Sequence, residues 1–125
     1  MKIFSVEEAN SLLPSVRRLV KKIQRAHARI IAQESAAKQA SESAEHGGGG
    51  IANGVVYAAN LMNMTALVGE LEALGVQLKD FSRGLIDFPS LRDGRVVLLC
   101  WQLGEGDRLE WWHDVDAGFA GRTPL

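Results

Sequence analysis

The spacing of apolar residues predicts two amphipathic helices in the first part of the chain. The first set of apolar positions repeats at steps of four and three residues and consists of Leu12, Val16, Leu19, Ile23, Ala26 and Ile30. A second set with the same kind of spacing consists of Tyr57, Leu61, Met64, Val68 and Leu71. This heptad spacing is typical of helices that pack at a shallow angle.

Local signals set the limits of the first helix. Ser5 and Glu8 have the spacing of a capping box, which predicts that the helix begins near Val6 and extends over residues 6–42. Pro14 lies too deep in this segment for a first-turn proline, so we expect a kink or a brief interruption near it.

A run of four glycines separates the two helices. Gly47–Gly50 has no propensity for helix or strand and predicts a flexible loop over residues 46–54. The second helix is then expected over residues 55–74, with Gly75 as its C-cap. Two helices joined by such a loop pack most simply as an antiparallel hairpin.

The last third of the chain has the pattern of strands and turns. Asp93 and Gly94 form a hairpin turn signal before Arg95–Trp101, the most strand-like segment. We expect a β-meander over residues 76–114 and an irregular tail over residues 115–125. The prediction is one α+β domain, residues 1–125, in which a long antiparallel helical hairpin precedes a three- to four-stranded antiparallel β-meander.

Two tight turns fix the register of the predicted meander. If Asp93 and Gly94 form a two-residue turn, Asp87 lies opposite Cys100; if the next turn spans residues 104–107, Cys100 lies opposite Trp111 and Leu98 opposite His113. Alternation places these side chains and Leu85 on one face of the sheet. The other face is more apolar and is expected to pack on the helices; it carries Ile86, Phe88, Val97, Leu99, Trp101, Leu103 and Trp112.

Composition and charge limit the classes of partner. Fourteen basic and fifteen acidic residues leave a net charge of −1, which gives no reason to expect nucleic acid or an anionic membrane as partner. The basic stretch Arg17–Arg29 is interpreted as a solvated helix face, and the alternative is a nucleic-acid-binding patch. With one cysteine, no signal peptide and no apolar run of roughly 20 residues, we expect a soluble cytoplasmic protein.

The candidate ligand-binding residues are Asp87, Cys100, Trp111 and His113 on the polar face of the meander, together with Arg122 in the tail. Asp87, Cys100 and His113 together suggest a thiol nucleophile or a three-ligand metal site. The alternative is that Cys100 is a small buried hydrophobic residue. Arg122 could bind an anion, or tie the tail to Asp87 or Asp114 through a salt bridge.

A second cluster near the strand ends offers a different metal site. Glu105, His113, Asp114 and Asp116 supply the nitrogen and oxygen ligands that a divalent cation can use. Acidic residues at turns are also simply turn formers. No other cofactor is predicted, and the sequence assigns no catalytic residue.

Ordered motifs along the chain resemble a known bacterial family. They are Glu7–Asn10, Leu12–Pro14, Gly84–Pro89, Gly94–Arg95, Leu99–Trp101, Gly104–Glu105, Trp112–His113 and Gly118–Arg122. Over nearly its whole length the chain resembles the family catalogued as domain of unknown function 2203. The resemblance implies no activity, cofactor or catalytic residue.

Two functional hypotheses follow from the sequence. The first is a non-enzymatic interaction protein that forms a homodimer through its helical hairpin, because the hairpin offers more apolar seam than a small sheet can cover. The alternative is a small-molecule or divalent-metal-binding domain, or an enzyme, with its site on the polar face of the meander.

Overall fold

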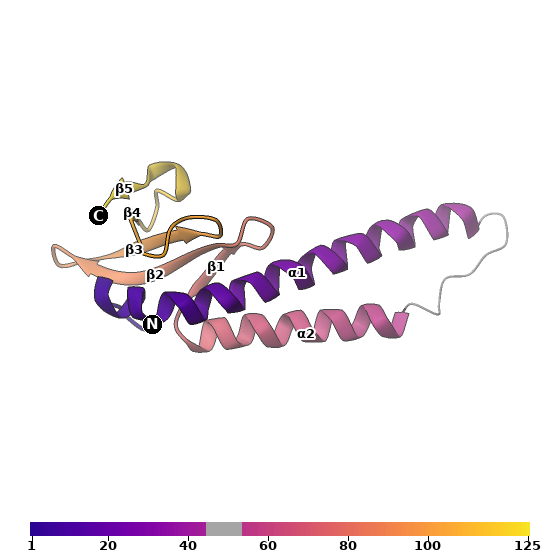
Figure 1. The fold of residues 1–125 in the computed structure, drawn as a ribbon. Coiled ribbons are helices and arrows are strands. Elements are labelled where there is room, and N and C mark those ends of the chain that lie inside the picture. Colours follow the sequence, from indigo (N-terminus) through magenta and orange to yellow (C-terminus); the bar gives the residue numbers. More distant parts are fainter. Residues whose placement is uncertain (45–53) are drawn as a thin grey trace.

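A computed structural model of the protein describes residues 1–44 and 54–125 (Figure 1). Two helices precede a five-stranded antiparallel sheet in which the strands follow one another in chain order. The α+β class is confirmed, and the sheet has one strand more than the three or four expected. The predicted loop Gly47–Gly50 lies outside the described residues.

Helix α1 extends over Val6–Ala44 and begins with the predicted capping box. The Glu8 N–H donates to the Ser5 hydroxyl at 3.0 Å, and the Ser5 N–H donates to the Glu8 carboxylate at 3.1 Å. The interruption predicted near Pro14 is absent, because the helix runs through it. Residues on both sides of Pro14, including Leu13 and Val16, are fully buried, and this packing offsets the missing backbone hydrogen bond.

Helix α2 extends over Gly54–Ala73 and lies alongside α1 (Figure 1). The Tyr57 hydroxyl donates to the Glu34 carboxylate at 2.9 Å, and the Asn60 amide donates to Gln33 at 3.0 Å. Leu71, near the end of the predicted seam, is fully buried. No helix among residues 1–44 and 54–125 is both long and apolar enough to cross a membrane.

The sheet has the register that the turns predict. Its strands are β1 (Gln77–Asp80), β2 (Leu85–Arg92), β3 (Arg95–Gln102), β4 (Trp111–Asp114) and β5 (Thr123–Pro124). The 3-10 helix η2 (Phe119–Gly121) lies between β4 and β5 in the chain. Asp87 pairs with Cys100, Cys100 with Trp111, and Leu98 with His113, as expected. The additional strand β5 comes from the predicted irregular tail, which returns to pair with β4.

The apolar face of the sheet packs on α1, as the alternation predicts. Ile86, Phe88, Leu99 and Trp101 form one buried cluster with helical residues that include Val20. The opposite face, which we call the outer face, carries Asp87, Cys100 and His113. Figure 1 shows η2 and β5 on the side of the sheet turned away from both helices.

Candidate functional site

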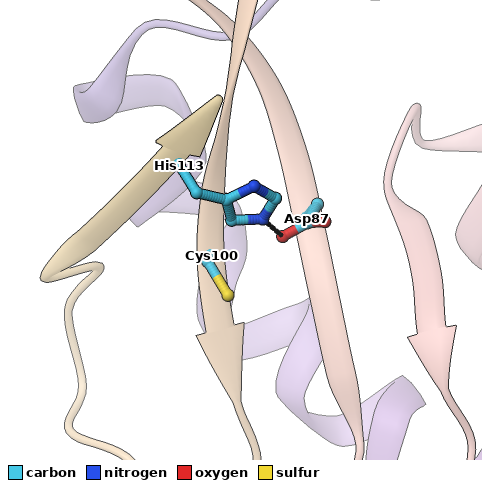
Figure 2. A group of neighbouring side chains, drawn as sticks. All are labelled: Asp87, Cys100 and His113. Atoms are coloured by element: carbon cyan, nitrogen blue, oxygen red, sulfur yellow. Dashed lines mark hydrogen bonds and ion pairs between the residues drawn. The ribbon is translucent and has the colours of Figure 1, made fainter. Parts of the chain in front are cut away.

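Three ionisable side chains meet on the outer face (Figure 2). Asp87 comes from β2, Cys100 from β3 and His113 from β4, so three neighbouring strands position them. One oxygen of Asp87, the sulfur of Cys100 and one ring nitrogen of His113 all lie within 4.8 Å of one another. The residues are 2%, 1% and 3% exposed, respectively. The structure thus brings together three residues that the sequence placed only on a common face.

The hydrogen bonds of His113 fix its tautomer. Its Nδ1 lies 2.7 Å from the carbonyl oxygen of Asp114. Because a carbonyl oxygen only accepts, Nδ1 carries a hydrogen. Its Nε2 lies 3.1 Å from Oδ1 of Asp87. One proton must therefore lie between these two atoms, either on the imidazole or on the carboxyl group, and in both cases the pair is electrically neutral.

Burial decides the protonation of the third member. Removal from water is the largest cause that raises the pKa of Cys100, to about 12, and the negative charge of Asp87 contributes further. Burial also raises the pKa of the Asp87 carboxyl, while the positive charge of His113 opposes this rise. Cys100 is therefore a neutral thiol at physiological pH.

This state does not suit Cys100 to nucleophilic catalysis. A catalytic cysteine needs a lowered pKa and access to its substrate, and Cys100 has neither. The imidazole of His113 also directs Nε2 to Asp87 and Nδ1 to the backbone. Of the two chemistries that the sequence suggested for these residues, metal ligation fits the geometry better.

The C-terminal segment adds a layer to the outer face. Trp111, directly opposite Cys100, has the Arg122 guanidinium over its ring at 4.6 Å. Arg122 also lies over the ring of Phe119 at 4.5 Å, and Arg83 lies over the same ring at 4.3 Å. Because Arg83 lies in the turn between β1 and β2, this stack extends from β4 to that turn. Arg122 of the tail thus covers the ring of Trp111.

Arg122 ties the tail to the loop between β3 and β4. Its guanidinium donates to both oxygens of Glu105, at 2.6 and 3.3 Å, with side-chain exposures of 10% for Arg122 and 25% for Glu105. A salt bridge of Arg122 was expected with Asp87 or Asp114. Asp87 instead pairs with His113, and Asp114 pairs with Arg95 at 3.0 Å. The two partners predicted for Arg122 were therefore wrong.

The second predicted metal cluster is not brought together. Glu105 is held by Arg122 and also accepts from the Gln102 N–H at 2.6 Å. Asp114 follows His113 in the strand, so its side chain leaves on the opposite side of the sheet. Asp116 is exposed. Within residues 1–44 and 54–125, the single group of three metal-capable side chains is Asp87, Cys100 and His113.

Sequence reasoning missed two features of the site. Phe119 was assigned to an irregular tail, although in the structure its ring lies between the guanidinium groups of Arg83 and Arg122. The carbonyl group of Asp114, which fixes the tautomer of His113, carries no sequence signal, because every residue has one.

Replacing Arg122 by alanine is expected to release the tail. Charged hydrogen bonds contribute about 1.5–3 kcal/mol, and the loss should raise amide hydrogen exchange at Thr123 and Leu125 and in the residues of β4 that pair with the tail. The matched control is Arg95→Ala, which removes an exposed ion pair and should cost less than about 1 kcal/mol. Equal exchange in the two variants would contradict a structural role for the Arg122–Glu105 contact.

Comparison with protein-family models matches residues 2–125 to the family described as "Uncharacterized conserved protein (DUF2203)". No curated protein matches the chain, and no solved structure matches it. The function must therefore be inferred from the chemistry of the site itself.

Proposed function

This chain belongs to the DUF2203 family, whose description names no reaction, and from the site we propose that it binds a divalent transition-metal ion of the zinc type. The proposed ligands are the carboxylate of Asp87, the thiolate of Cys100 and Nε2 of His113. One observation carries the proposal: the three ligand atoms lie within 4.8 Å of one another in a fully buried cluster.

The donor set favours zinc over magnesium or calcium. Zinc binds cysteine sulfur, histidine nitrogen and aspartate oxygen, whereas magnesium and calcium require oxygen ligands. The Nδ1–H of His113 donates to the Asp114 carbonyl, which would hold Nε2 ready as a ligand. Three protein ligands leave one position of a tetrahedral ion for a water molecule or a further ligand.

The charges of the cluster also suit a divalent cation. Without metal, the Asp87–His113 pair is neutral overall and Cys100 is a neutral thiol. A bound ion would replace two protons, one from the thiol and one shared by Asp87 and His113. The resulting carboxylate and thiolate would balance the two positive charges, so the exchange leaves no net charge buried.

A purely structural role explains this cluster less well. Buried ionic groups are often no more stabilising than well-packed apolar residues of similar volume. The stability of the core alone therefore gives little reason for three ionisable groups side by side in a small protein. Ligand binding gives a reason for their presence, and perturbed ionisable clusters are typical of functional sites.

Titration of chelator-treated protein with Zn²⁺ tests the proposal. We expect one ion per chain, two protons released on binding, and a higher melting temperature in the presence of the metal. Titration with Co²⁺ should produce the absorption of a thiolate-bound ion. The absence of binding for both ions would contradict the proposal.

Substitutions separate this site from the other acidic residues. Cys100→Ser and His113→Gln each remove a ligand and should weaken zinc binding by more than the roughly 10–100-fold that loss of an outer hydrogen-bond partner causes. Glu105→Gln and Asp114→Asn are the matched controls and should retain affinity within about tenfold. If these controls lost the metal and the ligand variants kept it, the proposed ligand set would be wrong.

A further inference from the structure

Helix α2 carries a second apolar seam on the side turned away from α1. Its members are all exposed, follow one another at steps of four and three residues, and consist of Val55, Ala59, Met62, Ala66, Gly69 and Ala73. The first five members each lie two residues before a member of the seam that faces α1. Two residues correspond to a rotation of about 200°, which places the two seams on opposite sides of the helix.

The outer seam has the composition of an interface. Val55 is 80% exposed and Met62 is 73% exposed, while residues 54–69 contain no acidic or basic residue. A surface helix that packs on one side only normally carries charged residues on the other. A helix that is apolar on both sides and packed on one of them is expected to have a second packing partner.

Gly69 provides an independent indication of a close neighbour. Apart from proline, glycine is the least favourable residue inside a helix. A Cβ atom added at Gly69 would meet nothing within 4 Å, and the residue does not have a positive φ. The contacts within residues 1–44 and 54–125 therefore give no reason for glycine here. Close approach of another helix backbone would give one.

The seam is complementary to itself in an antiparallel arrangement. A two-fold axis near Met64 pairs Val55 with Ala73, Ala59 with Gly69, and Met62 with Ala66 of the other copy. Larger side chains then meet smaller ones at each level. The acidic residues Glu70 and Glu72 fall at opposite ends of the interface, whereas a parallel pair would place them together.

From these observations we propose that a second copy of this chain binds the outer seam of α2, giving a homodimer with antiparallel α2 helices. The interface is isologous, because the same surface serves both subunits. It would extend over about 27 Å of helix from Val55 to Ala73. This assembly does not depend on the metal site, which lies in the sheet.

Sedimentation analysis of the full chain tests the proposal. We expect a dimer for the wild-type protein, with or without chelator. The substitution Met62→Lys should lower the affinity of the dimer at least about 100-fold, because the introduced charge would be buried in the interface. Ser35→Lys is the matched control: it introduces the same charge at an exposed position of α1 and should remain dimeric. A monomeric wild type, or a dimer that Met62→Lys leaves intact, would overturn the proposal.

An exchange of two residues tests the register. Ala66→Met alone places methionine opposite methionine and should weaken the dimer. Adding Met62→Ala restores one large and one small residue at that level and should recover most of the affinity. A cysteine pair, Ala59→Cys with Gly69→Cys, should form crosslinked dimers on oxidation. Failure of both the recovery and the crosslink would exclude this antiparallel register.

Discussion

Replacing Asp87 by alanine is expected to lower the free energy of unfolding of the metal-free protein by about 3–5 kcal/mol. Asp87 is 2% exposed and its carboxyl group is the hydrogen-bond partner of Nε2 of the equally buried His113. Without Asp87 that nitrogen loses its partner in a site closed to water. The loss is measured by urea denaturation of protein kept in chelator, so that metal binding does not contribute.

A matched control and a double variant define the origin of this effect. Asp114→Ala removes a neighbouring carboxylate from an exposed pair with Arg95 and should cost less than about 1 kcal/mol. The double variant Asp87→Ala with His113→Ala should lose clearly less unfolding free energy than the sum of the losses in the two single variants, because each single variant already removes the same interaction. An Asp87→Ala protein as stable as Asp114→Ala would show that the buried pair is not needed for the fold.

Raising the pH is expected to destabilise the metal-free protein through Cys100. The pKa of its thiol is raised from 9.0 to about 12 in the folded state, chiefly by burial. The stability that comes from keeping the thiol neutral is fully present below pH 9 and is lost as the pH rises from 9 toward 12. Three pH units at 1.36 kcal/mol each give a loss of about 4 kcal/mol at the end of this range.

The variant Cys100→Ala isolates this contribution. Lysine and tyrosine side chains also titrate at high pH, but they do so equally in the variant and in the wild type. The difference in unfolding free energy between the two proteins should therefore shrink as the pH rises, and it can be followed by urea denaturation at a series of pH values. A difference independent of pH would contradict the raised pKa of Cys100.

Much of the fold could be predicted because its signals are local. The capping box at Ser5 and Glu8 fixes the start of α1, and both seams between the helices follow from apolar spacing. The turn at Asp93–Gly94 fixes the pairing of β2 with β3 and thereby the common face of Asp87 and Cys100. A shift of one residue would move every side chain to the wrong face, so the register of a half-apolar sheet is strongly specified.

Other features depended on contacts between distant segments. The sequence predicted that Pro14 would interrupt the first helix, yet the packing of Leu13 and Val16 against the sheet holds α1 continuous. It left the tail irregular, whereas Arg122 finds Glu105 and β5 joins the sheet. The spacing of residues could not identify Glu105 as the partner of Arg122 or β4 as the partner of β5, because the path of the chain after β4 is not set by a local signal.

The amino-acid sequence by itself determined the two helices, the register from β2 to β4 and the grouping of Asp87, Cys100 and His113 on one face, because hydrogen bonding and side-chain alternation act between near neighbours. Only the tertiary structure decided that this face is buried, that Nδ1 of His113 donates to a backbone carbonyl, and that Cys100 stays a thiol. Burial and protonation depend on which distant atoms exclude water from a group, and no local pattern carries that information.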